Sequence, residues 1–476
     1  MTQMRSARRL CAALLLAPAA LFAAGCSDRP APLEPGEGGV TPVDPALAAI
    51  DCRADVRART LGCAPAAVPL GAAANRIIGG QNVNVKVATA NIAYDSVAEV
   101  FAADFTVQNL LVNKMGTADG ATVSGVRAFF HSGPTASGGT GAIEVLNASG
   151  IGTFTAGAQP YYQYNQVLSY QQTTAPLRWQ WSVPKTVTSF VFTLYIRTPV
   201  LPVVVFDQKD ALGNRDIWRV ALDGSDLVRL TTDGYEDKKP TVARNVVVWA
   251  TYRHGQSDLY RKSIFGGAET RLTATGASEF DPALSPDATK LAFTREVGGA
   301  AKLHTANADG TGVALAASSF GTPASIDGSP GWLNNTRLVY MSTAFGGADL
   351  YDLSLPGTPS ELASLLDATV TPSREANEVE PEWSPDGTRV AFASDAAGYD
   401  TEIYVKHVGT GVVTRITERA GIDSHPTWLS DGRIVYTAHV GGKWRLRWVD
   451  PASPGVQTDI PLNFALDARS PRAVRF

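Results

Sequence analysis

The amino-acid sequence predicts an all-β protein in which a small β-sandwich at residues 78–198 precedes a six-bladed β-propeller at residues 199–476. The propeller is predicted by a four-stranded unit that recurs every 42 to 51 residues in the second half of the chain. The sandwich is predicted by about seven short strands of alternating apolar residues, separated by Gly, Asn and Pro turns.

Residues 1–25 are predicted to be an export signal. Arg5, Arg8 and Arg9 precede an apolar run that is too short to span a bilayer comfortably, and "LFAAGC" then leads to Cys26. This arrangement resembles a bacterial lipoprotein signal, in which Cys26 becomes the lipidated first residue. We therefore expect an exported protein anchored by lipid to the cell envelope, at the outer membrane, facing either the periplasm or the surface. An ordinary secretory signal cut nearby is the alternative.

Two segments connect this signal to the first domain. Residues 26–50 are rich in Pro, Gly and acidic residues, which is typical of an extended tether. Residues 51–77 contain Cys52 and Cys63, and two thiols this close are expected to form a structural disulfide in an oxidising compartment. A metal site would need further ligands, and no His lies nearby.

The predicted sandwich resembles the immunoglobulin-like or fibronectin-like modules of bacterial envelope proteins. Within it, the stretch "PYYQYNQ" places Tyr161, Tyr162 and Tyr164 close together. If exposed and coplanar, these rings would form a stacking surface for a glycan; otherwise they are core residues whose hydroxyls reach the surface.

The repeats of the predicted propeller each begin with a hairpin that contains a proline. The best copy is "PEWSPDGTRVAFAS", which starts at Pro381 and is followed by "TEIYVKHVGTGVVTRIT". The first unit begins at its second strand, "PVVVF", and the chain ends on "SPRAVRF", which matches a first strand. The C-terminal strand is therefore expected to complete the first blade and close the ring. The other copies start at Pro240, Pro282, Pro330, Pro426 and Pro471.

These repeats resemble the TolB-like propeller family over residues 199–476. The resemblance implies the fold of this region and leaves its task open, because this propeller serves many functions. TolB itself carries an α/β domain before its propeller, whereas this chain is β-rich there.

An acidic residue recurs shortly before each repeat's proline. Such a set could form a ring of carboxylates at a channel mouth and attract a cation or a basic peptide. Alternatively, each acid braces the loop between two blades, which is the role that the TolB-like resemblance favours. His425, in "DSHP", is predicted to lie near the same mouth. The acids are Asp237, Glu279, Asp327, Glu378, Asp423 and Asp467.

Other features favour a binding protein over an enzyme. The net charge of −4 argues against a nucleic-acid partner. The sequence contains no Gly-x-Ser-x-Gly or His-Glu-x-x-His motif, and no metal or other cofactor is expected. Trp332, Trp383 and Trp428 share one register and are expected to pack between blades. The sequence predicts a non-catalytic scaffold for an envelope protein or peptide; a glycan-binding protein, or a polysaccharide- or peptide-degrading enzyme at the channel mouth, is the alternative.

Overall fold

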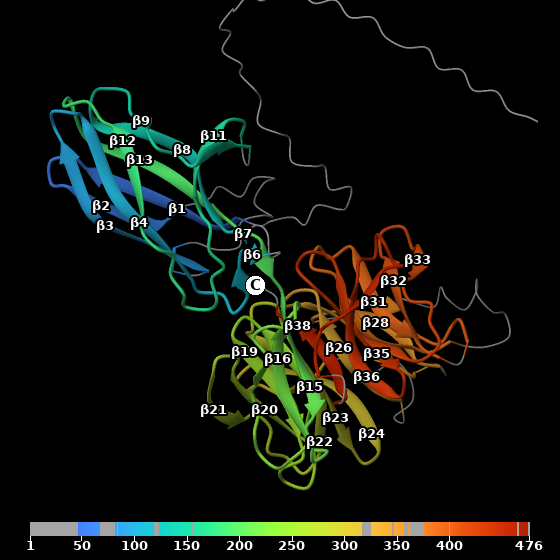
Figure 1. Cartoon of the computed structure of the whole chain (residues 1–476). Coiled ribbons are helices and arrows are strands. Elements are labelled where there is room, and N and C mark those ends of the chain that lie inside the picture. The colour runs from blue at the N-terminus through green and yellow to red at the C-terminus, as the bar shows by residue number, and fades with distance from the viewer. Residues whose placement is uncertain are drawn as a thin grey trace, which may run out of the picture. The chain divides into compact units, whose positions relative to one another are not determined.

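In the computed structural model, all regular structure among the described residues is β, which confirms the predicted class (Figure 1). The residues described are 46–66, 81–82, 84–118, 123–153, 156–316, 325–344, 347–356, 360–361, 376–398, 400–463 and 466–474. Cys26 and the predicted signal lie outside them. In this part of the chain, no helix has the length and apolar character to cross a membrane.

Two antiparallel sheets form the N-terminal part. One core, which includes Trp179, Trp181 and Phe190, combines side chains from both sheets. The first sheet runs β10 (Gly150–Gly152), β11 (Gln159–Tyr164), β8 (Val126–Gly139), β13 (Val187–Arg197), β1 (Ala46–Asp55) and β2 (Thr60–Pro65). The second runs β3 (Val85–Asp95), β4 (Val100–Asn109), β12 (Leu177–Ser182) and β9 (Glu144–Val145). Two short pairs are β5 (Lys114–Met115) with β14 (Val200–Leu201), and β6 (Thr117–Ala118) with β7 (Val123–Ser124).

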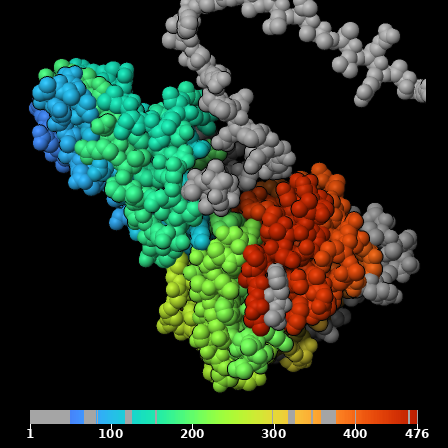
Figure 2. Space-filling view, in the orientation of Figure 1, coloured from blue at the N-terminus to red at the C-terminus, as the bar shows by residue number. Residues whose placement is uncertain are grey.

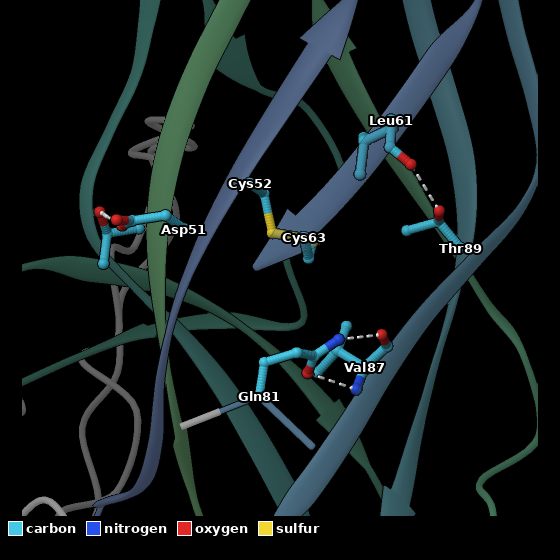
Figure 3. The surroundings of a disulfide bond; sticks show 8 residues. Asp51, Cys52, Leu61, Cys63, Gln81, Val87 and Thr89 are labelled. Carbon is cyan, nitrogen blue, oxygen red and sulfur yellow. Dashed lines mark hydrogen bonds between the residues drawn. A yellow bond between two sulfur atoms is a disulfide. The ribbon is translucent and has the colours of Figure 1, made fainter. Parts of the chain in front are cut away.

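Strands β1 and β2 extend the first sheet toward the N-terminus, beyond the predicted boundary at residue 78. β1 pairs with both β13 and β2, and Cys52 lies directly opposite Cys63. The two cysteines are joined by a disulfide (Figure 3). Ile50, Cys52 and Ala54 are buried while the residues between them are exposed, which is the two-residue period of a half-buried strand. The end of the predicted tether and the segment 51–77 thus contribute two strands to this sheet.

Six four-stranded antiparallel sheets follow. The first sheet consists of β38 (Ala468–Ala473), β15 (Val203–Lys209), β16 (Arg215–Ala221) and β17 (Val228–Arg229), and the second of β18 (Asp237–Ala243), β19 (Val246–Thr251), β20 (Asp258–Ser263) and β21 (Gly266–Arg271). The third consists of β22 (Ser278–Leu284), β23 (Lys290–Val297), β24 (Ala300–Asn307) and β25 (Ala314–Leu315), and the fourth of β26 (Asp327–Trp332), β27 (Arg337–Ser342), β28 (Asp349–Ser354) and β29 (Ser360–Glu361). The fifth consists of β30 (Glu378–Trp383), β31 (Arg389–Ser394), β32 (Glu402–His407) and β33 (Val413–Arg415), and the last of β34 (Asp423–Trp428), β35 (Ile434–Val440), β36 (Lys443–Val449) and β37 (Gln457–Asp459).

The first of these sheets combines the two ends of the region. β38 pairs antiparallel with β15, so red C-terminal residues adjoin green residues in Figure 2. Each proline-containing strand, which we call an inner strand, contacts the next one, from β18 through β22, β26, β30 and β34 to β38, and β38 contacts β18. Val204, Phe206 and Ala473 share one buried core with residues of the last sheet.

Tryptophans connect neighbouring sheets. The indole N–H of Trp332 donates to the carbonyl of Ala283, and that of Trp428 donates to the carbonyl of Glu382. Each acceptor lies on the inner strand of the preceding sheet. Trp383 is fully buried, with the Arg337 guanidinium 4.8 Å from its ring centre. This is the packing role that their shared register predicts.

Candidate functional site at the inner strands

The residue before each repeat's proline has an unusual backbone. Its φ lies between 50° and 56° in all six repeats, and the pairing register of the inner strand shifts around it. Residues other than glycine seldom adopt this left-handed region, and a following proline favours extended backbone. A β-bulge therefore recurs here and redirects one side chain in each inner strand. We call these the pre-proline residues: Lys239, Asp281, Ser329, Glu380, His425 and Ser470.

The six pre-proline residues line one small pocket of about 20 Å³, together with Arg472. An adjoining pocket shares Pro330 and Arg472 with it and extends to Glu382 and Thr427. The inner strands thus surround a polar space in which both signs of charge are present.

The charged groups in this pocket pair with one another. Lys239 Nζ lies 2.6 Å from Asp281 Oδ1, and His425 Nε2 lies 2.8 Å from Glu380 Oε1. The backbone N–H of His425 also donates to Glu380 Oε2 at 2.6 Å. Each pair joins adjacent inner strands, so the pre-proline residues stabilise contacts between sheets as well as lining the pocket.

These contacts shift two pKa values. Burial by itself would raise the pKa of Glu380, but the facing His425 and the nearby charge of Lys239 lower it to about 2. Burial would lower the pKa of Lys239, but Asp281 and Glu380 raise it. Both side chains are therefore held in their charged forms at neutral pH.

The predicted acidic ring is not exposed. Asp237, Glu279, Asp327, Glu378 and Asp423 are all buried at the starts of their inner strands, and Asp467 is half-buried just before β38. Glu279 accepts from Arg295 Nε at 2.9 Å, and Asp327 accepts from the Ser342 hydroxyl at 2.5 Å. The backbone N–H of Trp444 donates to Asp467 at 3.3 Å. Contacts of this kind correspond to the bracing role, because the side chains point into the sheets and loops.

Two of these buried acids have raised pKa values. Burial raises the pKa of Asp237 and that of Asp423 to about 6, although neighbouring threonine hydroxyls and arginine charges partly offset the effect. The two acids belong to different sheets, which begin with β18 and β34.

The predicted tyrosine surface does not form. Tyr162 and Tyr164 are buried, and the Tyr162 ring stacks on Trp179 with centres 4.1 Å apart. Tyr161 lies on the opposite face of β11 against Phe129. Because successive residues of a strand point to opposite faces, these rings cannot form one exposed plane.

Sequence reasoning found only His425 among the pre-proline residues. The signal that could have identified the others is their shared position directly before the proline, which their mixed chemistry concealed. Within the residues that the structure describes, no three His, Cys, Asp or Glu side chains are grouped as metal ligands would be.

Sequence comparison with known proteins identifies TolB proteins as relatives of this chain. A TolB homologue of Chlorobium luteolum is 32% identical over 187 residues, which make up 39% of this chain and 38% of that protein. The Tol-Pal system protein TolB of Francisella tularensis subsp. mediasiatica is 38% identical over 58 residues, or 12% of this chain and 13% of that one. The match thus spans about two fifths of the Chlorobium protein's length.

A structural comparison finds TolB from Acinetobacter baumannii with a TM-score of 0.49 and 14% identity, covering 57% of this chain and 66% of that one. No family model matches the chain. The sequence matches confirm the predicted resemblance to TolB-like β-propeller proteins over part of the chain.

Proposed function

We propose that this chain is a cell-envelope lipoprotein whose six sheets close into a propeller that binds a protein or peptide, without catalysis, over the pre-proline pocket. The observation that carries the proposal is the convergence of one redirected side chain from every inner strand on a single polar pocket. Backbone strain that recurs at one place is typical of functional sites.

The similarity to a protein named for the Tol-Pal system favours an interaction role in the envelope. The N-terminal sheets are proposed to be the immunoglobulin-like module, and Cys26 the lipidated residue. The outer-membrane location predicted above belongs to the same proposal.

Exposed apolar side chains next to the inner strands are the proposed contact residues for such a partner. Tyr235 precedes β18 and is 49% exposed, while Tyr252 follows β19 and is 46% exposed. Ile326 and Ile422, which directly precede β26 and β34, are exposed as well. Tyrosine is enriched at protein interfaces, and charged groups beside such a patch provide orientation.

The chemistry of the pocket supports binding over catalysis. Glu380, with a pKa of about 2, is a poor general acid and a weak general base near neutral pH. His425 is engaged with Glu380, and Lys239 with Asp281. A partner could exchange these pairings for its own charges.

The test is an in-cell crosslinking pull-down of the tagged protein. We expect the native form to recover a protein partner. A triple variant, in which Tyr235, Tyr252 and Ile326 are all changed to Ser, should lose that partner. The matched control is Leu212→Ser, which removes an exposed apolar side chain from the turn between β15 and β16. Equal recovery by the triple variant and the control, with both shown to fold, would contradict the proposal.

A further inference from the structure

A second pocket lies between the outer strands of the last two sheets. It has a volume of about 420 Å³ and is bordered by Arg415, Ile416, Glu418, Arg419, Arg447 and Gln457. This volume is in the range of small-ligand sites. Three of its four charged lining residues are arginines, so we call it the arginine groove.

Two of the arginines are fixed by the surrounding chain. The buried carboxylate of Glu402 accepts from Arg415 Nη2 at 2.8 Å. Arg447 donates from Nε to Asp459 at 2.6 Å and from Nη1 to the Gln457 side chain at 2.9 Å. An arginine carries five N–H donors, so donors of both guanidinium groups remain for a ligand.

Arg419 differs from these two. Its backbone N–H donates to Glu402 Oε1 at 3.1 Å, the same atom that holds Arg415, so the loop is fixed. Within the described chain, its guanidinium group makes no hydrogen bond or ion pair, and its Nε atom is buried without an acceptor. A buried donor without a partner is costly, so an acceptor bound in the groove would relieve this cost.

The corresponding loops of two other sheets show that this cation is not part of the repeat. Thr231, Thr273 and Thr417 are equivalent, because each hydroxyl accepts a backbone N–H from its neighbouring strand. The residues two positions later are Asp233, Thr275 and Arg419. Asp233 pairs with Arg253, and Thr275 donates to Glu279.

We propose that the arginine groove binds an oxyanion, the carboxylate or phosphate group of a small ligand, with Arg419 as its principal donor and Arg415 and Arg447 beside it. Charge-assisted hydrogen bonds from guanidinium groups match this chemistry in geometry and sign. Glu418, an exposed carboxylate on the rim, opposes the bound charge and limits affinity.

The test is isothermal titration calorimetry of the purified protein with citrate and, separately, inorganic phosphate, at an ionic strength held constant with sodium chloride. We expect binding of at least one probe. Arg419→Gln should weaken it by roughly 10-fold or more, since a hydrogen bond to a charged group is lost. Glu418→Gln should tighten it, by about 2-fold, because a like charge is removed.

Variants outside the groove and a conservative variant complete the experiment. Arg271→Gln removes a half-buried arginine that is paired with Asp258 in another sheet, and should leave the affinity unchanged. Arg419→Lys keeps the charge and should bind with intermediate affinity, even if Arg419→Gln fails to fold. Citrate binding alone would indicate a carboxylate ligand, and phosphate binding alone a phosphate ligand. No heat above the chloride control with either probe, or equal affinity in folded Arg419→Gln, would overturn the proposal.

Discussion

Two acidic positions of one inner strand, only two residues apart, lie in opposite environments. On β30, Glu378 is buried at the start of the strand, whereas Glu380 lies in the pre-proline pocket opposite His425. One acid from each position shows the contrast: burial raises the pKa of Asp423 to about 6, and charge pairing lowers the pKa of Glu380 to about 2. The comparison teaches that pairing with a charged neighbour, more than position in the repeat, decides whether the pKa of a carboxylate here is lowered or raised.

The largest expected effect comes from removing a buried, paired acid. Glu279→Ala leaves Arg295 without the carboxylate that it contacts at 2.9 Å, and should lower the free energy of unfolding by about 3 kcal/mol. Urea denaturation measures this. Glu236→Ala removes an exposed acid paired with Lys238 and should change stability by less than about 0.5 kcal/mol. Equal losses of stability in the two variants would contradict the expectation that a buried, paired acid contributes more than an exposed one.

The next effect concerns the pocket acid. Because the folded-state pKa of Glu380 is lowered from 4.5 to about 2, its ionised form stabilises the fold at any pH above about 4.5. This contribution disappears as the pH falls from 4.5 toward 2. Glu380→Gln should therefore cost about 2 kcal/mol at pH 7 and progressively less below pH 4.5, measured by denaturation across pH. A cost that is the same at pH 7 and pH 3 would contradict pairing as its cause.

Asp423 should show the opposite sign. Its folded-state pKa is raised from 3.8 to about 6, so the ionised form destabilises the fold above pH 6, and this penalty disappears as the pH falls through 6 toward 3.8. Asp423→Asn should raise stability by about 1–2 kcal/mol at pH 8 and by little at pH 4. Thermal denaturation at these two pH values tests it, and a loss of stability at pH 8 would show that the charged form is needed.

The smallest expected effect tests the backbone of the pre-proline position. Ser470 has φ 52°, which glycine adopts without steric cost, so Ser470→Gly should raise stability by up to about 1 kcal/mol. Ala468→Gly, on the same strand, should lower stability by a similar amount, because glycine at an ordinary strand position loses more backbone freedom on folding. If both variants lose stability equally in urea denaturation, strain at the pre-proline residue is refuted.

In the N-terminal sheets, the sequence did not predict strands β1 and β2. Residues 46–65 look like a tether followed by a cysteine-containing segment, because they contain small and charged residues. Their alternation of Ile50, Cys52 and Ala54 with charged residues is nevertheless that of a strand. β13, its partner, lies more than 130 residues away, and only tertiary pairing identifies it.

The sequence by itself determined the all-β class, the repeating four-stranded unit and the packing of Trp332, Trp383 and Trp428 between sheets, because apolar periodicity and register follow directly from residue order. It also placed the candidate binding residues in the segments that form the inner strands. Only the tertiary structure decided which of their residues lines the pocket. A simple two-residue period would give Glu378 and Glu380 the same face, but the bulge before Pro381 breaks that period. Side-chain direction past a bulge depends on backbone angles that residue types alone do not specify.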